Sequence, residues 1–147
     1  NVVAASASMT VDLRNTDEQL LREAEAELAR TVADLAASEG VEVAERTLAR
    51  FEPVEFDTRV VDTVAGAAAD LGHTVQRMPS GAGHDAQMMA RVCPTGMVFV
   101  PSRDGISHNP AEHTDPEHLV AGANVLVRTL LALDASDLTG PGSRGTA

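Results

Sequence analysis

The chain has 147 residues, with 11 arginines, no lysine and 22 acidic residues, so its formal net charge is −11. It has three phenylalanines and neither tryptophan nor tyrosine. Nucleic-acid binding needs a basic surface and, for single strands, aromatic side chains on which bases stack, so this composition excludes that class. No apolar run approaches the roughly 18 residues of a membrane-spanning helix. No charged-then-apolar leader begins the sequence, and we therefore expect a cytoplasmic location and no membrane partner.

The hydrophobic content of 44% overstates the core that this chain can build. Of those residues 24 are alanine, and alanine buries little apolar area per residue. A core with so little buried apolar area would be stabilised by contacts with a further part of the chain or with a second subunit. The sequence begins with Asn1 rather than Met, and a strand-like run follows at once. We therefore expect the chain to be a piece of a longer protein.

The first third of the sequence predicts two strands with a helix between them. Residues 7–13 alternate between apolar and polar side chains, which is typical of a half-buried strand. Thr16 and Gln19 have the spacing of a capping box, which predicts a helix with Thr16 as its N-cap. Apolar residues at helical spacing extend this helix to a stop at Gly40. Residues 41–51 predict the second strand.

The remaining sequence predicts two strands and three helical segments. Asp57 is the expected N-cap of one helix, and Asp115 followed by Pro116 predicts the start of the last helix. Residues 73–78 predict a short strand, and the apolar run within 95–101 predicts a buried one. A short helical turn is expected after the loop that ends at residue 85. Helical spacing assigns to the last helix an apolar face made of Leu119, Ala123, Leu126, Leu130 and Leu133.

Strands that alternate with helices define the fold class as α/β. The order of elements suggests parts of two α/β units, with a boundary near residue 54. Residues 136–147 are rich in glycine and small polar side chains, and we expect them to be disordered.

The first candidate site is the loop Ser80-Gly81-Ala82-Gly83-His84-Asp85, between a predicted strand and a predicted helix. Its glycines let the backbone approach a ligand, and a histidine beside a carboxylate suits proton transfer or polarisation of a carbonyl. The alternative is a tight turn in which Asp85 caps the helix. The loop has neither the pattern of a nucleophile elbow nor that of a nucleotide-binding loop.

Two further candidates are His108 and Arg14. His108 lies in a loop that follows the most buried predicted strand, where functional loops of α/β sheets occur, and a neutral imidazole can bind a metal. Its alternative is an ordinary surface histidine. Arg14 lies at the end of the polar face of the first strand, where it could bind a carboxylate through two hydrogen bonds. Its alternative is a surface arginine paired with Asp12 or Asp17.

Six short segments then occur in a characteristic order. They are Asn1-Val2-Val3, Asp12-Leu13-Arg14, Ser80-Gly81-Ala82-Gly83-His84-Asp85-Ala86, Pro94-Thr95-Gly96-Met97, Phe99-Val100-Pro101-Ser102 and Gly105-Ile106-Ser107-His108-Asn109-Pro110. Together they resemble the C-terminal part of the metal-dependent amidohydrolases that include N-carbamoyl-L-amino-acid hydrolase, allantoate amidohydrolase and β-ureidopropionase. The resemblance covers residues 1 to about 135.

This resemblance implies a two-domain fold, with a catalytic α/β domain and a smaller α/β lid domain that forms a homodimer. Residues 1–54 then correspond to the second part of the lid domain, and residues 55–135 to the C-terminal part of the catalytic domain. It also implies a divalent metal. Zinc is expected, although manganese, cobalt and nickel accept the same histidine and carboxylate ligands.

The resemblance also implies roles for five residues. His108 matches a metal ligand. His84 matches a histidine that contacts the substrate and stabilises the tetrahedral intermediate, and Gly83 lies beside the substrate. Asn1 and Arg14 match lid-domain residues that bind the carboxylate and amide of the substrate in the neighbouring subunit.

The implied activity is hydrolysis of linear C–N bonds in ureido or amide substrates that carry a carboxylate, by metal-activated water. The remaining ligands and the general base would lie upstream, so we expect the chain to be inactive alone. One alternative is a non-catalytic module that dimerises or binds a small anion and lacks the metal site. Another is a peptidase of the wider superfamily, which the motif at residues 80–85 disfavours. In-frame upstream sequence carrying the other ligands would favour the enzyme.

Overall fold

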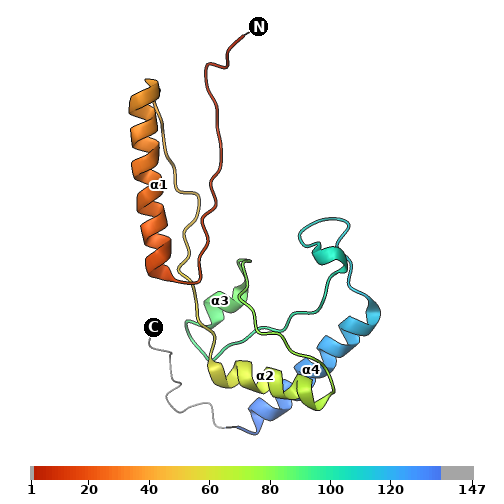
Figure 1. Cartoon of the computed structure of the whole chain (residues 1–147). Helices are drawn as coiled ribbons and strands as arrows, with labels where there is room; N and C mark the ends of the chain where they lie inside the picture. The colour runs from red at the N-terminus through yellow and green to blue at the C-terminus, as the bar shows by residue number, and fades with distance from the viewer. Residues whose placement is uncertain (1, 137–147) are drawn as a thin grey trace. The chain divides into compact units, whose positions relative to one another are not determined.

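A computed structural model describes residues 2–136, and among them it contains four α-helices and one short 3₁₀ turn (Figure 1). The helices are α1 (Glu18–Glu39), α2 (Thr58–Asp70), α3 (Asp85–Met89) and α4 (Pro116–Asp134), and the turn η1 is Arg103–Gly105. The chain divides into two compact units between Pro53 and Val54. The disorder expected at the C-terminus falls on residues 137–147, which lie outside the described part. No described helix is both long enough and apolar enough to cross a bilayer.

The four predicted strands are absent from the described residues, and this corrects the α/β expectation for the chain as it stands. Residues 7–13 run as coil before α1, and residues 41–51, 73–78 and 95–101 run as coil between the helices (Figure 1). Period-two patterning shows which faces of a segment suit burial, whereas a strand also requires a ladder of backbone hydrogen bonds to a neighbour. The four segments form no such ladder with one another. The helical half of the prediction is confirmed.

In the first unit, α1 begins one residue later than the capping-box prediction, because Asp17 rather than Thr16 is the N-cap. The Asp17 carboxylate accepts hydrogen bonds from the Gln19 and Leu20 amides at 2.8 and 3.0 Å. A carboxylate is favoured there because it also faces the positive end of the helix dipole. The predicted stop is confirmed: Gly40 is the C-cap, with a φ of 64°.

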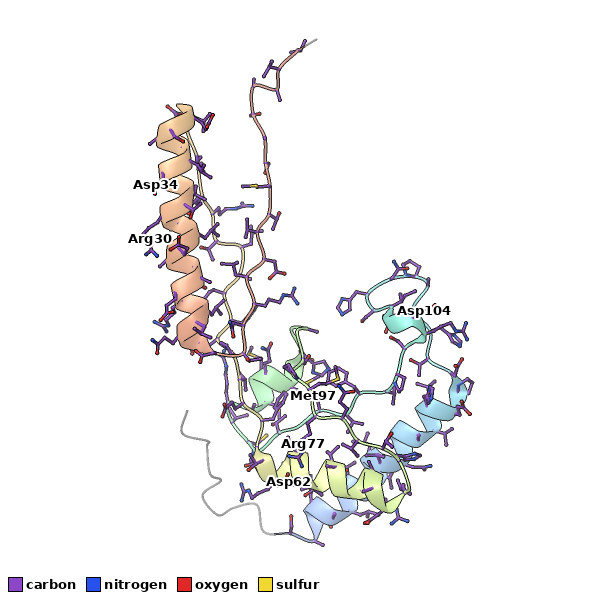
Figure 2. All side chains as sticks on the ribbon, in the orientation of Figure 1. Arg30, Asp34, Asp62, Arg77, Met97 and Asp104 are labelled. Carbon is purple, nitrogen blue, oxygen red and sulfur yellow. The ribbon has the colours of Figure 1, made fainter. Side chains whose placement is uncertain are left out.

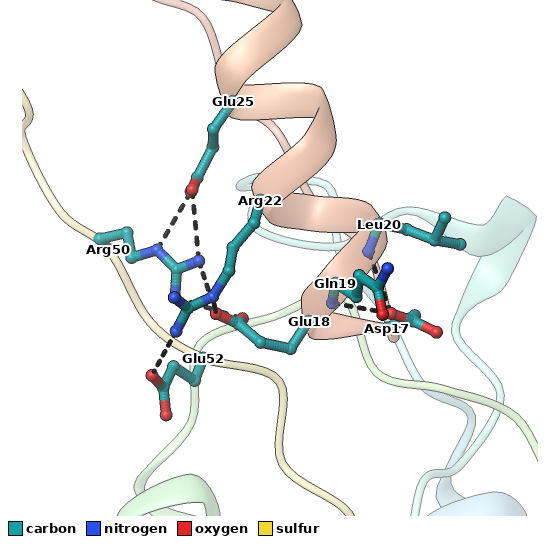
Figure 3. Close-up of polar contacts among 8 residues, drawn as sticks. All are labelled: Asp17, Glu18, Gln19, Leu20, Arg22, Glu25, Arg50 and Glu52. Carbon is teal, nitrogen blue, oxygen red and sulfur yellow. Dashed lines mark hydrogen bonds and ion pairs between the residues drawn. The ribbon is translucent and has the colours of Figure 1, made fainter.

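Ion pairs hold residues 41–53 against α1 within this unit (Figure 3). The Arg50 guanidinium binds Glu18 at 2.8 Å and Glu25 at 3.1 Å, and Arg22 bridges Glu18 and Glu52. These hydrogen bonds hold the pKa of the Glu18 carboxyl below its usual range. In this unit Leu21 is the one described hydrophobic residue that is buried.

The second unit is organised by the packing of α2 against α4. Ala67, Ala68 and Val125 form its buried centre, with Val64, Leu71 and Val98 packed around them. The α4 face predicted from leucine spacing is wrong for this chain, because Leu119, Leu126 and Leu130 are about half exposed. A neighbouring stripe with Val125 and Thr129 is buried instead. The surface of α2 that faces α4 has alanine at its centre, so the two helices pack closely through small side chains.

Residues 95–101 pack on both helices through two glycines. A Cβ atom on Gly96 would lie 2.8 Å from Val60 of α2, and one on Gly122 of α4 would lie 2.5 Å from Val100. Both distances are shorter than real Cβ contacts, so an alanine at either position would force the valine to move. The Asp57 amide also donates to the Thr95 carbonyl at 3.1 Å. Nearby, Arg77 binds Asp62 of α2 at 2.7 Å (Figure 2).

Candidate functional site

His84 is the N-cap of the short helix α3 and belongs to a complete capping box. Its Nδ1 accepts the Ala86 amide hydrogen at 3.0 Å, and its own amide donates to Gln87 Oε1 at 3.4 Å. The alternative in which Asp85 caps this helix is therefore wrong. Because Nδ1 accepts a hydrogen bond, it carries no proton in this arrangement, and Nε2 is the nitrogen that carries the proton of the neutral ring.

A groove of about 320 Å³ in the second unit has His84 in its lining. Most of the lining is apolar and comes from α2, α4 and residues 96–98. Thr129 is its other polar side chain, only 3% exposed, and the hydroxyl has no partner within the described residues. Apolar walls with few polar groups are typical of small-molecule sites.

Gly83 is neither strained nor packed in this fold. It is not among the glycines with positive φ, and a Cβ atom there would meet nothing closer than Gln87 Oε1 at 4.0 Å. The described residues therefore give no reason of their own for a glycine at this position, in contrast to Gly96 and Gly122.

His108 lies in the loop after η1 with a φ of 56°, a left-handed conformation that is uncommon for a residue with a side chain. Its amide donates to Glu112 Oε2 at 2.8 Å. Such backbone conformations cost of order 1–3 kcal/mol and cluster at functional sites.

The base of this loop is closed by a polar cluster. The Arg103 amide donates to the His113 carbonyl at 2.7 Å, and its guanidinium binds Asp115 at 2.8 Å. The His113 ring lies 3.1 Å from the same carboxylate. The Arg103 guanidinium is the main cause that lowers the pKa of the Asp115 carboxyl. Asp115 occupies the predicted N-cap position of α4, yet its side chain binds these partners rather than the helix amides.

The two lid-type candidates belong to the first unit. Arg14 hydrogen-bonds through Nε and Nη2 to the Asp12 carboxylate, the pair that one sequence interpretation anticipated. This hydrogen bonding lowers the pKa of the Asp12 carboxyl, and both side chains are exposed. Asn1 lies outside the described residues. The proposed substrate roles of both residues stay predictions.

No group of three possible metal ligands occurs in the part of the chain that the structure describes. A catalytic metal typically needs three protein ligands, so His108 and its described neighbours do not form a metal site by themselves. The assignments of His108 as a metal ligand and of zinc as the metal stay predictions.

One residue near the site was missed by the sequence analysis. Gln87 stands three positions after His84, which is the capping-box position for Glu or Gln. The signal was present, but histidine is not among the usual N-cap residues, so the box was not recognised.

Comparison with known proteins identifies the class. The family profile described as Peptidase family M20/M25/M40 matches residues 5–132, most of the chain, and the chain belongs to this family. Members of the family are typically metal-dependent hydrolases.

Within the family, the sequence is similar to amidohydrolases. It is 38% identical over 131 residues to an N-carbamoyl-L-amino-acid amidohydrolase from Rhizobium meliloti, covering 89% of this chain and 32% of that protein. It is 32% identical over 133 residues to an allantoate amidohydrolase from Bacillus subtilis, covering 90% of this chain and 32% of that protein. A crystal structure of an amidase of the hydantoinase/carbamoylase family from Burkholderia multivorans matches with a TM-score of 0.75 and 44% identity, covering 80% of this chain and 29% of that one. The chain spans about a third of the length of these curated relatives.

Proposed function

We propose that these residues are part of a metal-dependent amidohydrolase that cleaves linear C–N bonds in ureido or amide substrates, with N-carbamoyl-L-amino acids as the preferred class. The observation that carries the proposal is the similarity to N-carbamoyl-L-amino-acid amidohydrolases at 38 and 39% identity over about nine-tenths of the chain. Similarity to allantoate amidohydrolases makes allantoate the second class to test.

In this proposal His84 donates from Nε2 to the carbonyl oxygen of the substrate, as a fixed donor for the negative charge that develops during hydrolysis. Its Nδ1 bond to the Ala86 amide supports this role, because the ring is already held with the proton on Nε2. Gly83 leaves space beside the substrate. The nearest atom that the Cβ of an alanine would meet there, outside its chain neighbours, is Gln87 Oε1 at 4.0 Å, so Gly83→Ala tests this space without creating a clash.

His108 is proposed as one metal ligand, with the others supplied by sequence outside these 147 residues. The left-handed backbone of His108 and the hydrogen bond from its amide to Glu112 hold the residue in one conformation, which supports this role. Arg14 is proposed to exchange Asp12 for the carboxylate of the substrate, and Asn1 to bind the substrate beside it. A homodimer formed through residues 1–54 and a cytoplasmic location belong to the same proposal.

The test is an activity panel on the product of the complete reading frame that encodes these residues. N-carbamoyl-L-amino acids, allantoate, ureidoglycolate, a β-ureido acid and a dipeptide are compared by kcat/KM. We expect kcat/KM to be higher for the ureido substrates than for the dipeptide. We also expect Gly83→Ala to lower kcat/KM and to leave the melting temperature unchanged. Preference for the dipeptide would contradict the proposed substrate class. A reading frame that begins just before Asn1 and whose product hydrolyses none of these compounds would instead favour the non-catalytic module.

A further inference from the structure

His84 is held in place by hydrogen bonds to Gln87 and to the backbone of α3. Three hydrogen bonds join them: Ala86 N–H to His84 Nδ1 at 3.0 Å, His84 N–H to Gln87 Oε1 at 3.4 Å, and Gln87 N–H to the His84 carbonyl at 2.9 Å. The first of these acts on the imidazole ring itself, and the other two fix the backbone from which the ring extends.

A neutral imidazole exchanges between two tautomers unless one nitrogen is held as an acceptor. A backbone amide can only donate, so the Ala86 bond selects the tautomer with the proton on Nε2. The bond survives only while His84 keeps its extended N-cap conformation, with φ −145° and ψ 150°. The Gln87 carboxamide accepts the His84 amide hydrogen in this conformation, and it is the one side chain that does so in the described residues.

We propose that Gln87 is a positioning residue that keeps His84 in the Nε2-protonated tautomer, ready to donate to the carbonyl oxygen of a bound substrate. The part that concerns the substrate rests on the proposed function, whereas the tautomer itself does not. Gln87 touches no reacting atom. It acts through the capping box, and either Gln or Glu can occupy its position in that motif.

The experiment is ¹⁵N NMR of the histidine ring nitrogens at about pH 8, above the ordinary histidine titration range. The complete reading-frame product is compared with its Gln87→Ala, Gln87→Glu and Met88→Ala variants, and His84→Asn assigns the His84 signals. Met88→Ala is the matched control, because it shortens an exposed side chain of the same helix that takes no part in the capping box.

We expect the wild-type ring to show an unprotonated Nδ1 and a protonated Nε2. Gln87→Ala should move the two nitrogen shifts toward each other, as exchange between tautomers begins. Gln87→Glu should restore their separation, and Met88→Ala should leave it unchanged. An unaltered separation in Gln87→Ala would overturn the proposal, and so would a wild-type ring with its proton on Nδ1. Neither result depends on which substrate the protein hydrolyses.

The substrate half is tested in the complete reading-frame product with its best ureido substrate. Removing a whole oxyanion donor costs about 10²–10³ in kcat, so loss of its positioning residue should cost less, about tenfold, mainly in kcat. Gln87→Glu should recover most of this loss. Full kcat in a Gln87→Ala protein whose tautomers exchange would overturn the link between tautomer and catalysis.

Discussion

At the scale of single residues, two helical glycines give a matched test of the packing in the second unit, because one lies against a side chain and the other has open space beside it. A Cβ atom on Gly122 would meet Val100 at 2.5 Å, whereas one on Gly66 of α2 would meet nothing within 4 Å. Both substitutions to alanine raise helix propensity by the same amount, about 1 kcal/mol. Gly66→Ala should therefore stabilise the chain. Gly122→Ala should destabilise it by about 1–3 kcal/mol, because the valine must move.

Thermal unfolding of the two variants, followed by circular dichroism, measures this difference. Gly122→Ala as stable as Gly66→Ala would mean that residues 95–101 do not lie against α4 in solution.

Local chemistry marked His84 and His108 as candidates, whereas the roles proposed for them come from motif order. Local pattern alone favoured a tight turn capped by Asp85, and the structure shows His84 itself as the cap. The strained backbone of His108 also has no signature in a single sequence, because φ depends on the whole loop and its tether to Glu112. The roles of both residues stay predictions until their chemistry is measured.

At the scale of elements, α2 begins at a cap whose two contributions can be separated. Asp57 accepts the Arg59 amide hydrogen at 2.9 Å and also binds the Arg59 guanidinium at 2.9 Å. Asn caps as well as Asp but carries no charge, so Asp57→Asn removes mainly the ion pair. Asp57→Ala removes both and should cost about 1 kcal/mol or more.

The pH dependence of this cap follows from the pKa of Asp57. The Arg59 side chain is the main cause that lowers the pKa of the Asp57 carboxyl in the folded state. Its stabilisation is therefore present above the unfolded pKa of about 4 and is lost as pH falls through the folded value. The free energy of unfolding of wild type minus that of Asp57→Asn should shrink below about pH 4. A difference that grows with acid would contradict this interpretation.

The ion-pair cluster of the first unit makes a separate prediction. Arg50 binds two carboxylates of α1, and lysine lacks the planar fork that makes both contacts. Arg50→Lys should speed hydrogen exchange in residues 41–53, more at low salt than at high salt, where the wild-type pairs are already screened. Arg46→Lys is the control, because Arg46 makes no ion pair within the described residues. Equal exchange in the two variants would show that Arg50 does not hold the segment.

Helix starts and stops were largely predictable because their signals are local. Gly40 and Asp57 were identified correctly, and the error from Thr16 to Asp17 is one residue. Strands and buried faces were not predictable in the same way. Residues 95–101 have the composition of a buried strand, yet a ladder requires a neighbour that this chain does not provide among its described residues. Likewise, the surface of α2 decides which side of α4 is buried, and leucine spacing on α4 cannot reveal that surface.

At the scale of the whole molecule, the exposed leucines of α4 and the extended segments without a strand partner among the described residues are what we expect of a chain that is much shorter than its relatives. The chain spans about a third of its curated relatives, and few of its described side chains are buried. We therefore expect the purified 147-residue chain to bind zinc weakly and to hydrolyse no ureido substrate. Tight stoichiometric zinc binding with turnover by this chain would contradict that expectation.

The central claim is that His108 belongs to the metal site of an amidohydrolase. It is tested most directly by hydrolysis of an N-carbamoyl-L-amino acid by the complete reading-frame product, with bound metal measured in the same sample. His108→Ala is compared with His113→Ala, a histidine of the same loop whose ring contacts Asp115. We predict that His108→Ala loses bound metal and at least about 10²-fold in kcat/KM, in line with the loss of metal-ion catalysis, while His113→Ala keeps both. Full metal content and full activity in His108→Ala would contradict the account.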